Sequence, residues 1–600
     1  MVPVREVPAF PHLSKPKAMS HLVPSRSTRG LRSTTLGVAA VALAALPIAA
    51  QSGDSTQFRC EGRVITAIDI QPQPPAMIGR DPSTLKRAVQ HYLFQSGTTR
   101  DRAIRPFVLA HVGQTCHDDR LPEIARVVRA QPYIAVAVVR VEPDTGNGVK
   151  LVVQTVDEVP VIIGGGYTSH GFTNFKYGNS NIGGSGFLAS GQWRQGRAYR
   201  DGLQLTMRQF GLFGQPLVAN LDAQRDLLGG HFTADISRPF LSDLEHIAWY
   251  MGGTHEKAYR PFVRQDGPTL LLPVSRDVWS AGGVARFTWR GANAMIGPVA
   301  TYEHARPGVD GVTRTDTGLV AADTAVFDGR YTPYRTFRVG LAGGFRWINY
   351  LHVQGFDALL GEQDVGRGVQ LAATIERGTG AFDATDKSSL VSLDFYSGVG
   401  TPKSFFGLQM RGEELPAGGA DSWSAAVLSG RGAWYVKPTD RQTFETSLEF
   451  AGGWRERLPL QLSLGDSRSG LRGYNGAALG GGRRAVLRIE SRRLWFTTGK
   501  NAQWGNAIFT DVGKTWSGDV PFGETTVARA SVGVGLLAAI PPKSRRLIRA
   551  DIAVPVTGDA PKHWVIRVFA IDATRFFWRD PGDLSPVRAG APASPIFGWP

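Results

Sequence analysis

The side chain with the most specific chemistry in this chain of 600 residues is Arg472, which lies in a glycine-rich segment, LGDSRSGLRGY, at residues 464–474. A guanidinium group is planar and donates paired hydrogen bonds, so inside a polar cavity it needs carboxylate partners, and lysine does not offer the same geometry. Gly470 and Gly473 lack side chains and would let the backbone turn tightly against a wall. The alternative interpretation is a surface hairpin whose arginine is solvated.

Acidic residues follow this segment in the next two predicted strands. Glu490 lies in residues 484–491, and Asp511 lies in residues 507–513 within an aromatic-x-Asp-x-Gly pattern. This order of loop, Glu strand and Asp-Gly strand, before three final strands, resembles the Omp85 and two-partner-secretion superfamily of outer-membrane barrels, including the bacterial surface antigen D15-type barrel. The resemblance implies that the loop folds back into the barrel lumen, where its arginine meets Glu490 and Asp511. The loop motif that carries the resemblance consists of Leu471, Arg472, Gly473 and Tyr474.

Composition favours many aromatic strands joined by glycine turns over a helical enzyme, because the chain has 72 Gly, 30 Phe, 14 Trp and 14 Tyr but only 2 Cys. Short segments of alternating hydropathy follow from residue 159 onward; in one of them Leu203, Leu205 and Met207 alternate with polar residues. This pattern is typical of a transmembrane barrel, whose residues face lipid and lumen in turn. We therefore predict a mainly β fold, with a transmembrane antiparallel β-barrel of about 16 strands at residues 159–578.

The formal net charge of +16 narrows the choice of partners. A basic chain can bind nucleic acid, but the arginines here occur singly on alternating strands and not as a patch with interleaved aromatic residues. Anionic lipid headgroups or an acidic client are the better expectation.

Residues 1–50 read as a secretory signal peptide, because a basic, proline-containing stretch precedes a short apolar run at residues 36–50 that ends in small residues. Such a run is shorter than the roughly 20 residues of a spanning helix. We expect Met19 to be the true start, and residues 51–61 to form a linker.

Export gives the two cysteines, Cys60 and Cys116, a plausible use as one disulfide, because exported proteins meet an oxidising compartment. Metal binding beside His111 and His117 is the alternative, although a metal site needs more ligands than these. We therefore expect no metal and no cofactor.

Residues 62–158 are predicted to form a small α/β domain of order β-α-α-β-β. With its position before a barrel, this order resembles a POTRA domain, the periplasmic module of Omp85-type proteins. Its sheet would leave an open edge on which an extended client peptide could add a strand; the alternative is a scaffold that only supports the barrel mouth. The predicted elements are a strand at 64–71, helices at 82–93 (with Ser83 as a possible cap) and 121–128, and strands at 134–141 and 149–156.

The C-terminal end departs from the resemblance, since the family usually ends at an aromatic residue that closes the last strand. Here Phe577 and Trp578 are followed by a proline-rich tail at residues 579–600, which we expect to be disordered.

Two other motifs suggest enzymes but lack the required context. Gly465-Asp466-Ser467 resembles an esterase serine, yet none of the 12 histidines lies in a recognisable catalytic motif. A Gly533-x-Gly535 turn resembles a nucleotide-binding loop, yet its segment alternates as a strand. We therefore expect no enzyme, although a lipase-type barrel remains open because a triad assembles in space.

The resemblance implies a protein of the bacterial outer membrane that translocates polypeptides or inserts barrels, with the N-terminal domain in the periplasm. Its partners would be unfolded client polypeptides and outer-membrane lipids, with no nucleic acid. Insertases usually have several POTRA domains and two-partner transporters usually have two, so the single domain predicted here leaves the client open. The alternative is a passive diffusion pore or a structural barrel without clients.

Overall fold

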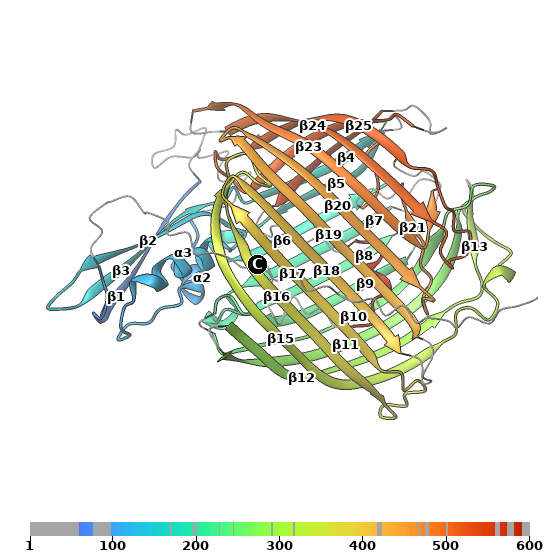
Figure 1. The fold of residues 1–600 in the computed structure, drawn as a ribbon, viewed down its shortest axis with the longest axis horizontal. Coiled ribbons are helices and arrows are strands. Elements are labelled where there is room, and N and C mark those ends of the chain that lie inside the picture. Colours follow the sequence, from blue (N-terminus) through green and yellow to red (C-terminus); the bar gives the residue numbers. More distant parts are fainter. Residues whose placement is uncertain are drawn as a thin grey trace, which may run out of the picture. The chain divides into compact units, whose positions relative to one another are not determined.

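The fold is that of a computed structural model in which a small α/β region precedes a large closed β-barrel (Figure 1). The predicted signal peptide and the helix predicted at 82–93 lie outside the described residues. The structure describes residues 59–590 except for 76–97, 169–170, 196–200, 227–228, 244, 290–291, 316–317, 417–422, 466–468, 475–478, 500–501, 558–563 and 573–580.

The α/β region is built on a three-stranded sheet of order β1-β3-β2, in which β1 (Ile65–Gln73) runs parallel to β3 (Val149–Asp157) and β2 (Ile134–Pro143) runs antiparallel to it. The central strand β3 is mostly buried, which suits its run of Val and Leu. Helix α3 (Leu121–Arg129) places Ile124, Val127 and Val128 in the same core, at the helical spacing seen in the sequence. A short helix, α2 (Asp101–Ile104), was not predicted.

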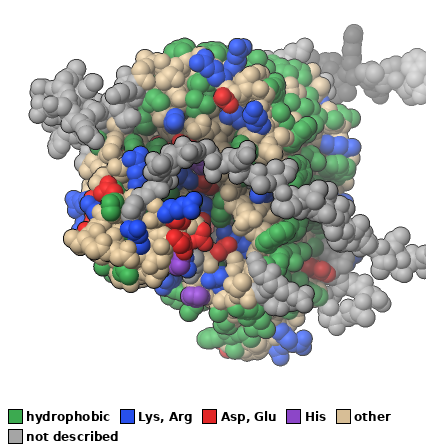
Figure 2. Space-filling model, turned by 60° about the vertical axis from the view of Figure 1, so that its left-hand side comes forward, with side chains coloured by type: hydrophobic (Ala, Val, Ile, Leu, Met, Phe, Trp, Pro, Cys, Tyr) green, Lys and Arg blue, Asp and Glu red, His purple; other side chains and the backbone are tan. Residues whose placement is uncertain are grey.

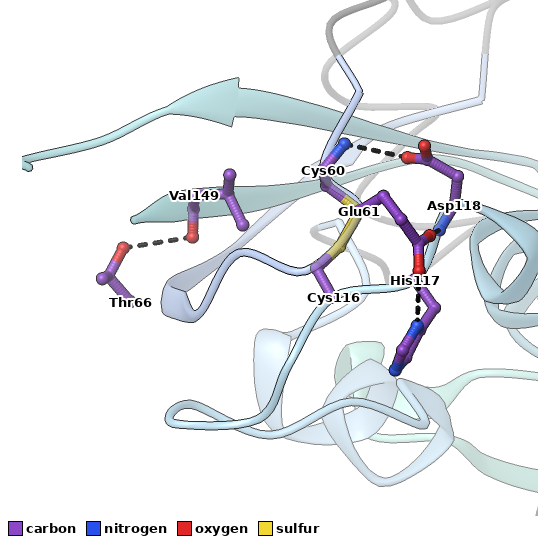
Figure 3. The surroundings of a disulfide bond; sticks show 7 residues. All are labelled: Cys60, Glu61, Thr66, Cys116, His117, Asp118 and Val149. Carbon is purple, nitrogen blue, oxygen red and sulfur yellow. Dashed lines mark hydrogen bonds and ion pairs between the residues drawn. A yellow bond between two sulfur atoms is a disulfide. The ribbon is translucent and has the colours of Figure 1, made fainter. Parts of the chain in front are cut away.

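A disulfide between Cys60 and Cys116 joins the chain just before β1 to the segment that leads into α3 (Figure 3). Around it, the Cys60 N–H donates to Asp118 Oδ1 at 2.9 Å, and the Asp118 N–H donates to Glu61 Oε2 at 3.0 Å. The Glu61 carboxylate also lies 2.8 Å from His117 Nδ1. No group of three or more metal-ligating side chains lies together anywhere in the described part of the chain.

The double variant Cys60→Ser/Cys116→Ser should lower the free energy of unfolding of the α/β region by about 4 kcal/mol, because the bridge closes a long loop in the unfolded chain. Limited proteolysis across a urea series would measure this, with the heat-modifiable mobility of the barrel as the control for intact strands. An α/β region that stays equally resistant to protease would contradict the prediction.

Asp157, at the end of β3, is an acid enclosed by the α/β region, with 3% of its surface exposed. Its carboxylate accepts hydrogen bonds from the Thr99 N–H and the Thr99 hydroxyl, both at 2.7 Å. Burial outweighs these bonds and raises the pKa of Asp157 from 3.8 to about 7.

The stability of the α/β region should therefore fall as the pH rises from about 4 to about 7. In that range the unfolded chain has lost the Asp157 proton and the folded chain keeps it, so Asp157 removes up to about 4 kcal/mol from the free energy of unfolding. Hydrogen exchange of the β3 amides between pH 4 and pH 8, compared with Asp157→Asn, isolates this effect from other acids. A difference between the two proteins that does not change with pH would refute it.

The barrel closes with 20 strands among the described residues, and not with about 16 as predicted. The strands β4 to β9 are only 8 to 10 residues long, so each contains few repeats of the alternation between apolar and polar residues that indicates a strand. The barrel strands are β4 Val161–Thr168, β5 Gly171–Asn179, β6 Phe187–Arg194, β7 Gly202–Phe210, β8 Val218–Asp226, β9 Gly229–Arg238, β10 Ile247–Phe262, β11 Leu270–Trp289, β12 Ala292–Pro307, β15 Tyr334–Gln354, β16 Glu362–Thr379, β17 Leu390–Thr401, β18 Ser404–Pro416, β19 Trp423–Thr439, β20 Gln442–Trp454, β23 Arg483–Thr498, β24 Ala502–Trp516, β25 Arg529–Ala539, β26 Arg546–Pro555 and β27 Val565–Asp572.

Neighbouring strands pair antiparallel around the barrel, and β27 closes it by pairing with β4. The hairpin β13 (Val312–Thr315) and β14 (Gly318–Ala321) extends the connection between β12 and β15, which pair directly. The fold class predicted from the sequence, a barrel preceded by a small α/β region, is confirmed.

The wall of the barrel separates apolar from charged side chains. Ile489 and Ile508 are 46% and 59% exposed on the outer face, whereas Glu490 and Asp511 of the same two strands are buried. Figure 2 shows hydrophobic side chains gathered along the side of the barrel. An outer surface of this kind is stable against lipid, and the charged face lines the lumen. No helix in the described residues is long and apolar enough to cross a membrane.

The α/β region meets the barrel through the turn between β25 and β26. The Glu158 carboxylate accepts hydrogen bonds from the Ser544 hydroxyl at 2.6 Å and the Arg545 N–H at 3.0 Å. The Arg129 guanidinium forms an ion pair with Asp364 of β16 at 2.7 Å. The α/β region is therefore attached at the end of the barrel where β25 ends and where β26 and β16 begin.

The expectation of a disordered C-terminal tail is wrong for residues 581–590. Leu584 and Val587 are buried in an apolar cluster against the barrel wall, and Asp583 pairs with Arg484 of β23. The tail is ordered here because the lumen supplies it with both apolar surface and charged partners, which its own composition lacks.

Candidate functional site in the barrel lumen

The glycine-rich segment at residues 464–474 lies inside the barrel, between β20 and β23. Its base is a short ladder between β21 (Leu462–Ser463) and β22 (Gly480–Gly481), and the Leu464 N–H donates to the Leu479 carbonyl at 3.0 Å. The Leu471 N–H donates back to the Leu464 carbonyl at 2.9 Å, which folds the segment into a compact loop. Residues 466–468, which include the serine of the esterase-like motif, lie outside the described residues.

Arg472 brings together the residues that the sequence singled out. Its guanidinium donates to both oxygens of Asp511 on β24, from Nε at 2.8 Å and from Nη2 at 2.6 Å. Its Nη1 donates to Glu490 Oε2 on β23 at 2.8 Å, and its backbone N–H donates to Asp511 at 3.2 Å. One arginine thus joins the loop to two adjacent strands with the bidentate geometry that only a guanidinium provides.

Aromatic stacking adds a third contact to this arginine. The Arg472 guanidinium carbon lies 3.5 Å from the centre of the Phe509 ring on β24, in cation–π geometry. Gly533 of β25 lies beside that ring, and a Cβ atom added to Gly533 would be 2.3 Å from Phe509 Cζ. Glycine is therefore required at position 533, because the Phe509 ring occupies the space that a side chain would need. The nucleotide-loop interpretation of Gly533 and Gly535 is wrong, because both lie within β25.

Arg549 of β26 is a second arginine of the site that motif matching did not single out. It donates from Nη1 and Nη2 to Glu490 at 2.7 and 2.8 Å, and from Nε to Asp551 at 2.6 Å. Arg492 lies 3.4 Å from Glu490 on the other side. The alternation of Arg549 and Asp551 on one face of a strand was the available signal, but it did not reveal which residue they would meet.

Tyr474 ties the end of the loop to the last strands. Its hydroxyl donates to the Thr557 carbonyl, 2.6 Å away, beyond the end of β26, and lies 3.1 Å from the Ala530 carbonyl of β25. Gly473 has a φ of +91°, a conformation that favours glycine, and it lies against Pro555. Arg472, Gly473 and Tyr474 of the loop motif therefore each have a separate contact with the wall.

Leu471 packs on Gly513, the glycine of the Asp-x-Gly pattern. A Cβ atom added to Gly513 would lie 2.9 Å from Leu471 Cδ2 and 3.0 Å from Leu464 Cδ2. Both leucines are fully buried, together with Tyr474 and Val486. Asp511 and Gly513 therefore act together on the loop, because the acid binds it and the glycine two residues later leaves room for it.

Gly513→Leu should displace the loop from the wall, because the added side chain claims the space of two leucines, and such overpacking costs about 1–3 kcal/mol. Trypsin cleavage at Arg472 in the folded barrel, followed by mass spectrometry, would report the displacement. Gly191→Leu is the matched control, since a Cβ atom added to Gly191 of β6 meets nothing within 4 Å. Equal cleavage in the two variants would contradict the prediction.

A cavity of about 310 Å³ opens beside the loop. Charged side chains of both signs line it, including Arg472, Glu490 and Arg549 on one side, and Pro581 and Gly582 of the C-terminal segment contribute to its lining. Because several of its arginines are held in ion pairs with Glu445, Glu449 and Glu490, the site is suited to holding a loop in place and to contacting polar groups of a polypeptide.

Comparisons with known proteins give similarities in fold. No family model and no curated protein matches the chain. Among solved structures, BamA from Haemophilus ducreyi lacking POTRA domains 1–3 is similar at 13% identity over 85% of each chain, with a TM-score of 0.38. CdiB from Escherichia coli is similar at 13% identity over 85% of this chain and 77% of that chain, with a TM-score of 0.42. BauA, the ferric preacinetobactin receptor from Acinetobacter baumannii, matches at 11% identity over 73% of this chain and 85% of that chain, with a TM-score of 0.34. At these TM-scores the likenesses decide nothing about function, which we infer from the contacts within the chain.

Proposed function

We propose that this chain is an outer-membrane protein of the Omp85 type that moves unfolded polypeptides across, or inserts them into, the bacterial outer membrane. The observation that carries the proposal is the loop at residues 464–474, which lies inside a charged lumen and is held by Arg472 on Glu490 and Asp511.

The α/β region supports the capture of a client before it reaches the barrel. In the sheet order β1-β3-β2, β1 and β2 are the outer strands, and beyond the backbone contacts of Ile65 with Gly113 and Gln114 no described strand pairs with their outer edges. An extended client segment can add to such an edge through backbone hydrogen bonds, so that binding tolerates many sequences. In this proposal the region is a POTRA module in the periplasm, and its attachment through Glu158 and Ser544 delivers the client at the barrel mouth.

The proposal is tested by depleting the protein in its host and quantifying outer-membrane and secreted proteins by mass spectrometry. Loss of many barrel proteins would identify an insertase, and loss of one or a few large secreted proteins would identify a dedicated transporter. Complementation with the wild type should restore the inventory. An unchanged inventory would overturn the proposal and favour a diffusion pore, which planar-bilayer conductance with solute selectivity would then establish.

An enzymatic barrel is tested separately. Hydrolysis of a lipid or ester panel by the purified protein, abolished by a serine reagent, would replace the transport proposal with a lipase-type function.

A further inference from the structure

The segment at residues 581–590, with the sequence PGDLSPVRAG, lies within the lumen and contacts the wall at widely separated strands. Its hydrogen bonds reach β11, β15, β18, β19 and β23. A segment held at so many strands crosses the interior of the barrel and does not simply follow one side of it.

Wall arginines bind the backbone of this segment. The two terminal nitrogens of Arg276 on β11 donate to the carbonyls of Pro586 at 2.7 Å and Arg588 at 2.6 Å. Arg338 of β15 donates to the Ala589 carbonyl at 3.0 Å. These hydrogen bonds recognise peptide carbonyls, which every polypeptide has, and not particular side chains.

Glu413 on β18 accepts hydrogen bonds from the N–H groups of the same segment. Its Oε2 accepts the N–H groups of Ala589 at 2.9 Å and Gly590 at 3.1 Å, and its Oε1 lies 3.4 Å from the Arg588 guanidinium. Arg588 also donates to the Ser429 hydroxyl of β19 at 2.5 Å. The wall therefore offers both donors and acceptors to an extended peptide.

The arginines are oriented by a partner that does not belong to the segment. Glu303 on β12, of which 1% is exposed, accepts from Arg276 Nε at 2.7 Å and lies 3.3 Å from Arg338 Nη2. Arg276 keeps its Nε on Glu303 and directs both terminal nitrogens to the peptide, whereas Nη2 of Arg338 donates to Glu303 and to the Ala589 carbonyl together. Because Glu303 would hold these arginines without the segment, the wall is preorganised to bind a peptide.

Side chains of the segment anchor it at its start. Asp583 receives a hydrogen bond from Arg484 Nη2 of β23 at 3.0 Å. Leu584 and Val587 are 0% and 6% exposed and pack in an apolar cluster with Tyr334 and other wall residues. The fit of these side chains favours the chain's own C-terminal segment over other peptides, while the backbone contacts would accept either.

We propose that this face of the lumen is a binding site for extended polypeptide, that residues 581–590 occupy it as an intramolecular ligand, and that they leave when a client enters. The last step rests on the proposed function, whereas the binding site and its occupation do not. The ligand class is an unfolded peptide that offers backbone groups in an extended form, with an arginine favoured beside Glu413.

The test uses the full-length protein and a variant lacking residues 581–600, each purified and placed in planar bilayers. The truncated barrel should conduct at least severalfold more ions, and a synthetic PGDLSPVRAG peptide should reduce its conductance in a saturable way. A peptide with glutamate in place of the arginine should bind at least tenfold more weakly, because Glu413 would then repel it. Unchanged conductance after truncation, or equal effects of the two peptides, would overturn the proposal.

A second variant covers the case in which the truncated chain folds poorly. Glu413→Gln in the full chain should raise the open fraction of the channel, since it removes the charge that holds Arg588 and the two N–H groups. Asp226→Asn on β8 is the matched control, because Asp226 pairs with Arg194 of β6 at 2.9 Å and β8 makes none of the hydrogen bonds to residues 581–590 described above. Equal open fractions in the two variants would overturn the proposal. No client enters these measurements, so they can fail or succeed independently of the transport function.

Discussion

Arg472→Ala is expected to reduce client handling at least tenfold in a barrel that remains folded. The variant removes three side-chain hydrogen bonds and the contact with Phe509, and it leaves Asp511, which is fully buried, without its bidentate partner. Breaking a buried ion pair by removing one partner costs about 3–5 kcal/mol. We expect the loop to detach from the wall while the barrel stays folded, because the barrel strands keep their own hydrogen bonds.

Two companion variants separate the role of the loop from that of the buried charge. Arg472→Ala/Asp511→Asn should regain stability, because the unpaired carboxylate is gone, but should not regain activity. Arg472→Lys should lie between the wild type and Arg472→Ala, since lysine keeps the charge and loses the paired geometry. Heat-modifiable gel mobility reports the fold, and the amount of client in the outer-membrane or secreted fraction reports activity. Normal client handling by a folded Arg472→Ala barrel would refute the role of this residue.

The contact of Arg472 with Glu490 and Asp511 could be predicted from the sequence because these two acids lie on adjacent strands. In the pairing of β23 with β24, Arg488 lies opposite Asp511 and Glu490 lies opposite Phe509. A period of two then places both acids on the lumenal face. Only the register and the inward direction of the loop had to be supplied by the resemblance to a family.

Arg549 shows where such reasoning ends. Its strand, β26, is separated by β24 and β25 from β23, which carries Glu490, so this contact depends on the curvature of the wall and on three strand registers together. Neither quantity is encoded in a short motif. The same applies to Arg276 and Glu413, because no local pattern around them indicates that residues 581–590 bind between their strands.

The order of the C-terminal segment at residues 581–590 could not be predicted, for a related reason. Composition tests whether a segment can bury enough of its own apolar surface to fold, and residues 581–590 cannot. It does not test whether distant strands provide a surface for Leu584 and Val587 or a partner for Asp583. The strand number was misjudged because the short strands β4 to β9 give a weak alternation, although their hydrogen-bond partners continue the barrel without a break.

Locking the C-terminal segment in place should abolish client passage. Ser429→Cys and Arg588→Cys put thiols where a side chain of the segment meets β19, and a flexible, photocleavable bis-maleimide can replace the lost arginine contact. The only native cysteines, Cys60 and Cys116, are joined in a disulfide, so the new thiols are the ones that react. The linked barrel should lose client transport at least tenfold, and light should restore it, because the segment then regains the freedom to leave the lumen.

The matched control links Arg194→Cys on β6 to Asp226→Cys on β8, whose native side chains form an ion pair at 2.9 Å, with the same reagent. This link attaches the same reagent to the barrel wall without tethering the C-terminal segment, so transport should stay at the level of the unlinked protein. Mass spectrometry of the cross-linked peptides would establish that each link has formed. If the tail-linked protein handles its client normally before illumination, the segment is a permanent part of the wall, and the client takes a path that does not require its departure. If transport falls only in the tail-linked protein, the same surface that binds the chain's own C-terminus lies on the route of the client.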